Sequence, residues 1–443
     1  MSWAKKTIGE LCLIEKGKIG IQKATPGEFP LVVTAEERLS HNEYHFEGHA
    51  VVIPLVSSTG HGHRSLKRIH FQSGKFAVGN ILCVVMPNDE NILRADYLYR
   101  FLDLNREKEL VGRMRGMANV TLPMKEIAQI EIPVPPVEAQ IDFVEQYSTL
   151  EEKSNDLGVE LTHQLDLVKQ LRQAFLREAM QGKLVPQDPN DEPASVLLEK
   201  IKAEKVLRQA QGTLKKQKPM PTITEEEIPF EIPDNWVWCR LGELCNTITK
   251  GSSPKWQGVN YVDTYEKGIL FITSKNVDSF KIDLSDSSYV EAKFNEIEPR
   301  SMLKKGDLLT NIVGASIGRT ALFDLDLVAN INQAVCILRI EHEYVDKPYL
   351  LNLMNSEFVI NLMLEMQFAP GRANLSMSNL ANFPILLPPL SEQQRIVAKL
   401  DELMQYCDEL EMSIKESQQQ NELLLQQVLR EALEPEEKEV EKV

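Results

Sequence analysis

The sequence predicts a multi-domain α/β (α+β) protein in which two mixed α/β domains alternate with two long amphipathic helices. Its 443 residues exceed one ordinary core and suit two domains with connectors. Proline pairs, Pro135-Pro136 and Pro388-Pro389, each open a long helical pattern that closes on Leu-Arg-Glu-Ala. From proline pair to closing motif the two copies keep a constant offset of 253 residues, so we expect an internal pseudo-two-fold repeat.

The first mixed α/β domain is predicted over residues 1–134. The β-branched run at 50–56 lies between glycine-containing turns, which is typical of a buried strand. Further strands are expected at residues 76–78, 81–85 and 130–134. An amphipathic helix is expected at 94–110, followed by a loop at 113–120.

The first helical region, 135–181, has apolar residues at a period close to 3.5, as in a coiled coil. They are Ile141, Val144, Leu150, Leu157, Leu161, Leu165, Val168, Leu171 and Phe175. A helical linker at 182–230 contains a shorter helix, 194–211. The second helical region, 390–433, carries the stripe Ile396, Leu400, Leu403, Leu410, Ile414, Leu424 and Val428, with polar residues placed among them at 417–421. The acidic tail, 434–443, is too charged to pack.

The second domain, 231–389, repeats the plan of the first. Residues 241–245 match residues 8–12 at offset 233, and Cys336 matches Cys83 at offset 253. The matched glycines Gly306 and Gly48 are 258 residues apart, which places about 25 extra residues between Gly251 and Gly306. A repeated scaffold with dissimilar intervening segments predicts two different recognition surfaces on one framework.

The net charge of −16 is unevenly distributed. Residues 138–180 and 391–443 carry 23 acidic and 10 basic side chains, so −13 of the charge lies on the long helices and the tail. Residues 1–137 carry 17 basic and 15 acidic side chains. A DNA-binding role therefore stays open, whereas a broad phosphate-neutralising surface does not.

Cysteine usage and the N-terminal residues predict the compartment. The six cysteines form no CxxC pair and lie mostly in apolar runs, so we expect buried reduced thiols. The start lacks a signal-peptide core, and no apolar run is long enough for a membrane span. We expect a cytoplasmic protein.

Motifs of catalysis are mostly missing from the sequence. It has no GxxxxGK[ST] phosphate loop, no Asn-Pro-Pro-aromatic motif for adenine methylation and no nuclease carboxylate–lysine set. Six of the eight histidines cluster in the first domain: His41, His45, His49, His61, His63 and His70. Their spacing fits no known zinc motif. Three interpretations of the cluster stay open: a metal site, a solvated loop and contact with DNA.

Two pairs of loops have residues suited to binding nucleic acid. Their glycines let the protein backbone approach a groove closely, and their Ser, Asn, Arg and Lys side chains can bond bases or phosphates. A solvated turn between strands is the alternative for each. The first pair is residues 57–68 and 314–320, and the second is residues 113–119 and 371–374; weaker candidates lie at 250–256 and 274–276. The candidate DNA-binding residues are Ser58, Thr59, His61, His63, Arg64, Lys67, Arg68, Arg113, Arg115, Asn119, Lys255, Lys275, Ser316, Arg319, Arg372 and Asn374.

With these motifs in order, the chain resembles the specificity (S) subunits of type I restriction–modification enzymes. The resemblance rests on the Pro-Pro-x-x-Glu-Ala-Gln step at 135 and the Pro-Pro-Leu-Ser-Glu-Gln-Gln step at 388. The Leu-Arg-Glu-Ala helix ends, the Gly-Lys-Leu-Val-Pro-Gln run at 182 and the Pro-Asp-Asn-Trp entry at 233 add to it. Each motif alone is weak, but together they cover nearly the whole chain.

The resemblance implies two target recognition domains, each reading one half of a bipartite site in double-stranded DNA, with the two helices antiparallel as a ruler. It implies docking of two methylation (M) subunits, which use S-adenosylmethionine, and two restriction (R) subunits, which use ATP and Mg. This chain would then be non-catalytic, without cofactor or metal of its own. The rival hypotheses are a self-contained methyltransferase or endonuclease and a coiled-coil scaffold without DNA function.

Overall fold

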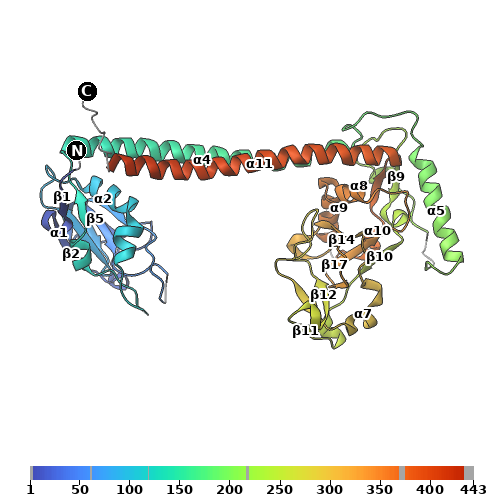
Figure 1. The fold of residues 1–443 in the computed structure, drawn as a ribbon, viewed down its shortest axis with the longest axis horizontal. Helices are drawn as coiled ribbons and strands as arrows, with labels where there is room; N and C mark the ends of the chain where they lie inside the picture. Colours follow the sequence, from blue (N-terminus) through green and yellow to red (C-terminus); the bar gives the residue numbers. More distant parts are fainter. Residues whose placement is uncertain (1–2, 60–61, 118, 216–218, 369–374, 434–443) are drawn as a thin grey trace, which may run out of the picture. The chain divides into compact units, whose positions relative to one another are not determined.

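A computed structural model describes residues 3–59, 62–117, 119–215, 219–368 and 375–433. The chain divides into two compact units, each holding one mixed α/β domain (Figure 1). Unit 1 comprises residues 1–163 and 414–443, and unit 2 comprises residues 164–413. Each long helix therefore contributes one half to each unit.

Unit 1 is built on a six-stranded sheet. Its strands are β2 (Cys12–Lys16), β3 (Phe29–Val32), β4 (Leu39–His41), β5 (Phe46–Pro54), β6 (His70–Val78) and β7 (Leu82–Pro87). Their order is β2-β7-β5-β6-β3-β4, antiparallel except for β3 beside β6. Val51 and Val52 of β5 are fully buried in core clusters on opposite faces. The β-branched run is therefore a central strand, as predicted.

Short elements connect this sheet to the first long helix. They are β1 (Lys5–Thr7), α1 (Ile8–Leu11), α2 (Ala95–Leu104), α3 (Met124–Ala128) and β8 (Glu131–Pro133). The long helix that follows is α4 (Val137–Met180). The helix predicted at 94–110 is too long. The α2 helix ends at Leu104, where the Asn105 side chain donates to the Phe101 carbonyl at 2.9 Å, and a π-helical turn, Arg106–Leu110, follows.

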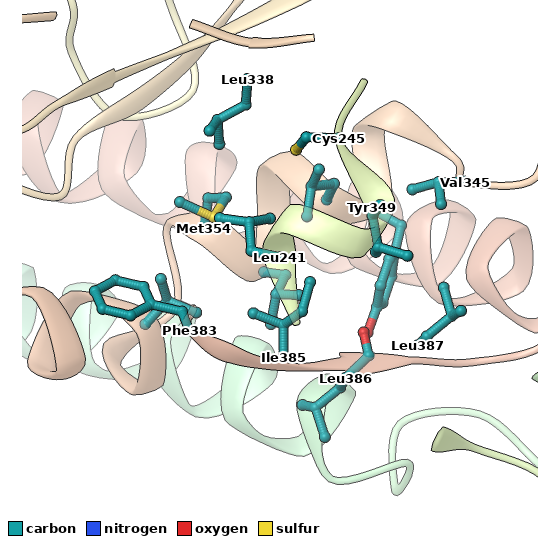
Figure 2. Packing of buried hydrophobic residues seen from close by; sticks show 14 of the residues in the cluster. Leu241, Cys245, Leu338, Val345, Tyr349, Met354, Phe383, Ile385, Leu386 and Leu387 are labelled. Carbon is teal, nitrogen blue, oxygen red and sulfur yellow. The ribbon is translucent and has the colours of Figure 1, made fainter. Parts of the chain in front are cut away.

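Unit 2 contains two four-stranded sheets, β10-β17-β14-β15 and β11-β13-β12-β16, and the two-stranded pair β9-β18. The strands are β9 (Val237–Arg240), β10 (Thr247–Lys250), β11 (Tyr261–Val262), β12 (Ile269–Ile272), β13 (Ser288–Val290), β14 (Asp307–Asn311), β15 (Thr320–Phe323), β16 (Ala329–Ile331), β17 (Val335–Arg339) and β18 (Pro384–Leu387). The helices are α5 (Ala194–Ala210), α6 (Leu241–Leu244), α7 (Lys293–Ile297), α8 (Lys347–Met354), α9 (Glu357–Phe368), α10 (Met377–Ala381) and α11 (Leu390–Leu433). Figure 2 shows part of the core, where Leu241, Tyr349, Ile385 and their neighbours pack together.

The predicted repeat is confirmed element by element. In both units a short strand pairs antiparallel with the last strand before the long helix, β1 with β8 and β9 with β18. The triplet β2-β7-β5 recurs as β10-β17-β14 with all pairs antiparallel. Helices α4 and α11 each have 44 residues, and their starts and ends are both offset by 253. The antiparallel pair β3-β4, with β3 parallel to β6, recurs as β12-β13, with β12 parallel to β16. The extra residues of the second copy include β11 and α7, for which the described part of unit 1 has no equivalent strand or helix.

Within each unit, the segments of α4 and α11 lie side by side and antiparallel (Figure 1). In unit 2 the Arg172 guanidinium bonds Asp408 at 2.7 Å and Glu411 at 3.1 Å. In unit 1 the Asn421 amide donates to the Ser154 carbonyl at 2.9 Å. The positions related to these two by the 253-residue offset are Val168 and Cys407, which are both buried. The polar interruption therefore lies on the seam in one unit only, so the helix pair is asymmetric.

A buried tyrosine–glutamine clamp fastens each long helix to its domain. In unit 1 the Tyr97 hydroxyl donates to the Pro133 carbonyl at 3.1 Å, while Gln140 accepts from the Arg94 amide at 2.9 Å. In unit 2 the Tyr349 hydroxyl donates to the Leu386 carbonyl at 3.3 Å, while Gln393 accepts from the Asp346 amide at 2.8 Å. Both glutamines are fully buried. The glutamine of each proline-step motif thus holds the helix start against the domain.

The linker is held by a buried carboxylate that has no counterpart in the first copy. Glu392 accepts from the Trp236 indole at 2.9 Å and from the Gln187 amide at 2.5 Å. Burial raises the pKa of Glu392 above its usual value. The corresponding position in α4 is Ala139, so only the second helix start receives a linker in this way.

Candidate nucleic-acid interface

In unit 1 the two candidate loops predicted from the sequence, residues 57–68 and 113–119, lie next to each other. The loop after β5 meets residues 120–122 in a short ladder: Ser57 donates its amide to the Val120 carbonyl at 3.0 Å, and Leu122 donates to Leu55 at 2.9 Å. Inside the β5 loop, the Ser57 hydroxyl donates to the His63 carbonyl at 2.6 Å, and Ser58 Oγ accepts from the Lys67 amide at 3.0 Å. The two loops are therefore one hydrogen-bonded surface.

Most candidate residues of unit 1 lie exposed on this surface, which we call the unit 1 loop surface. The exposed members are Ser58, Thr59, His63, Arg64, Lys67, Arg115 and Asn119. Three candidate arginines are held by carboxylates: Arg115 by Glu126 at 2.8 Å, Arg113 by Glu109 at 3.0 Å and Arg68 by Glu36 at 2.8 Å. Arg64 and Lys67 therefore offer their charge to a ligand most directly. His61 lies outside the described residues.

In unit 2 the equivalent strand ends also gather candidate loops. Lys250 of β10 and Thr310 of β14 both stand opposite Cys336 of β17, so the two strands end at the same level. The fully buried Asn311 then donates to the Ser274 carbonyl at 3.0 Å and the Val277 carbonyl at 3.1 Å. This amide connects the loop after β12 to the loop after β14.

The candidate residues of unit 2 lie around this edge. Lys275 and Arg319 are exposed, with loose ion pairs at 3.5 Å to Asp286 and Asp278, and Ser316 is half-buried in a 3₁₀ turn after β14. Lys255 is exposed on the 3₁₀ turn Pro254–Gln257. Arg372 and Asn374 lie outside the described residues. The structure thus brings Lys275, Ser316 and Arg319 together through Asn311.

Two members of the histidine cluster, His41 and His70, are buried in unit 1. His41 is buried, with Nδ1 at 3.1 Å from the Thr25 carbonyl oxygen, and His70 is buried beside Arg38. His49 pairs with Glu90 at 2.9 Å. The solvated-loop interpretation is therefore wrong for His41 and His70. Within the described ranges, no group of three or more His, Cys, Asp or Glu side chains could hold a metal ion.

His70 should make unit 1 sensitive to acid. Burial, with Arg38 and Arg68 nearby, lowers the pKa of His70 from 6.5 to about 4. Between these values the unfolded chain binds a proton that the folded chain does not, so stability falls as pH falls from 6.5 to 4, by up to about 3 kcal/mol. We expect His70→Gln to flatten the pH dependence of urea unfolding, followed by hydrogen exchange in β6. The exposed His63→Gln is the control, and an equal slope in both variants would contradict this.

All six cysteines are free and buried, which confirms the prediction for them. Burial raises the pKa of Cys83 and of Cys245 to about 12, so these thiols stay protonated and unreactive near neutral pH.

Sequence reasoning missed three exposed apolar residues near the loops. Met117 in the second loop is 93% exposed, and Trp256 beside Lys255 is 77% exposed. Phe280 is 40% exposed and is the one non-glycine residue with positive φ (71°) among the described residues. None of the three is among the candidate DNA-binding residues, which have charged or hydrogen-bonding side chains. Large exposed apolar side chains are nevertheless a signal of binding in their own right.

The comparison with known families now gives the class of this chain. The family described as type I restriction modification DNA specificity domain matches residues 1–165 and 233–419, which is most of the sequence. The chain belongs to this family.

Curated relatives of the chain are specificity subunits of type I restriction enzymes. The EcoAI subunit of Escherichia coli is 33% identical over 262 residues, 57% of this chain and 42% of that protein. The EcoDI subunit of Escherichia coli is 22% identical over 435 residues, 98% of this chain and 88% of that protein. The match thus spans less than half the length of the EcoAI subunit.

Solved structures share the fold. A crystal structure of the HsdS subunit from Thermoanaerobacter tengcongensis has a TM-score of 0.55 at 19% identity, covering 98% of this chain and 96% of that one. A chain from a study of assembly and conformational transition of the type I R-M system has a TM-score of 0.59 at 19% identity, covering 98% of each. None of the described helices has the length and apolar character that crossing a membrane requires.

Proposed function

We propose that this chain is the sequence-specific DNA recognition subunit of a type I restriction–modification complex. Residues 1–134 and 231–389 each read one half of a bipartite site. The observation that carries this is the loop surface at equivalent strand ends, after β5 and after β14, on a scaffold that repeats while the loops differ. Two domains with different loops on one repeated scaffold would suit a DNA site whose two halves differ in sequence.

The chain directs partner subunits and performs no chemistry itself. Two methylation subunits would methylate adenine with S-adenosylmethionine, and two restriction subunits would cleave DNA with ATP and Mg. The long helices support this docking role because they expose large apolar residues away from their seam. Leu157, Val159, Leu410 and Met412 are 45%, 72%, 49% and 59% exposed.

The test is sequencing of N6-methyladenine in DNA from cells that carry this chain with its methylation partner. We expect one bipartite motif with a fixed spacer, and exchanging residues 1–134 for those of a relative should change one half only. S-adenosylmethionine binding by the purified chain alone would favour a methyltransferase. A reconstituted complex that methylates no sequence would favour a scaffold.

The acidic helices lead us to predict a weak salt dependence for the isolated chain. Six exposed loop cations, Arg64, Lys67, Arg115, Lys255, Lys275 and Arg319, would give a slope of log K against log salt of at most about −5. The complex with methylation subunits should give a steeper slope, because those subunits would supply further phosphate contacts. Salt titrations of binding to one duplex measure both values. Equal slopes for the isolated chain and the complex would contradict the prediction that the methylation subunits make additional phosphate contacts.

A further inference from the structure

Met117 is the most exposed large apolar side chain among the described residues, at 93%. It lies in the 113–119 loop, which is part of the unit 1 loop surface. Exposed apolar residues are common on proteins, so exposure alone decides nothing. What distinguishes Met117 is how the base of its turn is held and which exposed side chains the neighbouring loop carries.

The turn that carries Met117 is rigid at its base. Arg115 and Thr121 exchange both backbone hydrogen bonds, each at 2.8 Å, and Thr121 also bridges to Val56. Gly116 has φ of +113°, and a Cβ there would lie 2.3 Å from the Asn119 carbonyl oxygen. Only glycine fits so tight a turn. The base of the turn is therefore fixed by hydrogen bonds, and Met117 lies beyond it with a 93% exposed side chain.

Exposed cationic side chains lie on the two loops that meet near this apolar tip. The β5 loop passes close by, since a Cβ on Gly62 would lie 3.0 Å from the Met117 carbonyl oxygen. Arg64 and Lys67 of that loop are exposed, as is Arg115 at the base of the turn. A protein partner would call for an apolar patch, whereas one apolar side chain among cations fits a ligand with anionic edges and an apolar interior. Duplex DNA has that chemistry.

We propose that Met117 is a wedge that enters the DNA at a base step in the half-site read by unit 1. The cations hold the flanking phosphates, and the unbranched, polarisable thioether fills the gap between partly unstacked bases. Flexible pyrimidine–purine steps open most easily, so the wedge adds sequence preference at a step where no hydrogen bond is made. This inference rests on the proposed function in DNA recognition.

The test uses the full chain without methylation subunits, so that no partner can flip a base. The probes are duplexes of the methylated sequence, with 2-aminopurine replacing each adenine of the half-site in turn. With the natural chain, fluorescence should rise at one step, which reports unstacking. Met117→Ala should abolish this rise and weaken binding to the site at least about fivefold relative to unrelated DNA. Met117→Leu should retain most of both.

The matched control is Ile92→Ala, which truncates a 45% exposed side chain beyond the far end of β7 and should change neither reading. An equal fluorescence rise with Met117→Ala would overturn the wedge and leave DNA recognition standing. The wedge would also be overturned if Met117→Ala bound the site more weakly while the natural chain gave no rise in 2-aminopurine fluorescence. That result would indicate a contact with a base edge, such as a thymine methyl. A natural chain that does not discriminate the site from unrelated DNA would instead refute the proposed function.

Discussion

A chain that ends at Gln181 should be inactive as a monomer and should regain methylation activity, with its partner subunits, as a dimer. Truncation removes α11, and Leu161, Val168 and Leu176, which are 6%, 6% and 1% exposed in the full chain, lose their cover. Reburying each is worth about 1.5–3 kcal/mol. A second copy of α4 can supply the missing helix because α4 and α11 repeat at one constant offset. The dimer should methylate a symmetric site made of the first half-site twice.

Sedimentation and methylome sequencing test this together. Val168→Asp in the truncated chain should give inactive monomers, since an unpaired charge would be buried on the seam. Val159→Asp, at a position 72% exposed, is the matched control and should dimerise normally. A monomeric half that methylates a defined sequence would refute the prediction.

The clamp glutamines should be among the most costly single residues to remove. Gln393→Ala deletes the bonds to the Asp346 amide and to the Pro388 carbonyl, at 2.8 and 2.9 Å, and leaves both groups without this partner. We expect unit 2 to lose about 3 kcal/mol of unfolding free energy. Gln140→Ala should cost unit 1 a similar amount, because it deletes bonds to Arg94, Ile92 and Pro135.

The neighbouring Gln394 is exposed and provides a control within the same motif. Urea unfolding of Gln393→Ala and Gln394→Ala, read by hydrogen exchange in β18, compares the two positions directly. Equal stability of the two variants would contradict the prediction that the buried Gln393 stabilises unit 2.

The long helices could be predicted almost to the residue. Proline pairs mark the start of both, Gly182 marks the end of the first, and a period close to 3.5 residues marks their length. Their seam could not. Leu157, Leu171, Leu410 and Leu424 were predicted to face it and are exposed at 45%, 37%, 49% and 61%. Which residue meets the partner depends on the register between the helices, as for Asn421 with Ser154, and the period of a single helix does not contain that information.

The candidate loops could also be predicted, from glycine, hydroxyl and cationic residues after a buried strand. Their assembly could not, since the bond from Ser57 to Val120 joins segments more than sixty residues apart in sequence. The sequence likewise gave no sign that Arg115 is held by Glu126 or Arg68 by Glu36, because these pairs form only once the loops have folded together.

The tyrosine–glutamine clamps have a consequence for how new specificities arise. Each domain is attached through a tyrosine that bonds the strand before the proline pair and a glutamine at the start of the helix, so the two attachment points are equivalent. A crossover in the gene at a proline step would exchange a whole domain, and the clamp would form again where the incoming domain carries the same tyrosine. Diversity can therefore accumulate by shuffling of intact readers, without the loss of stability that most point substitutions bring.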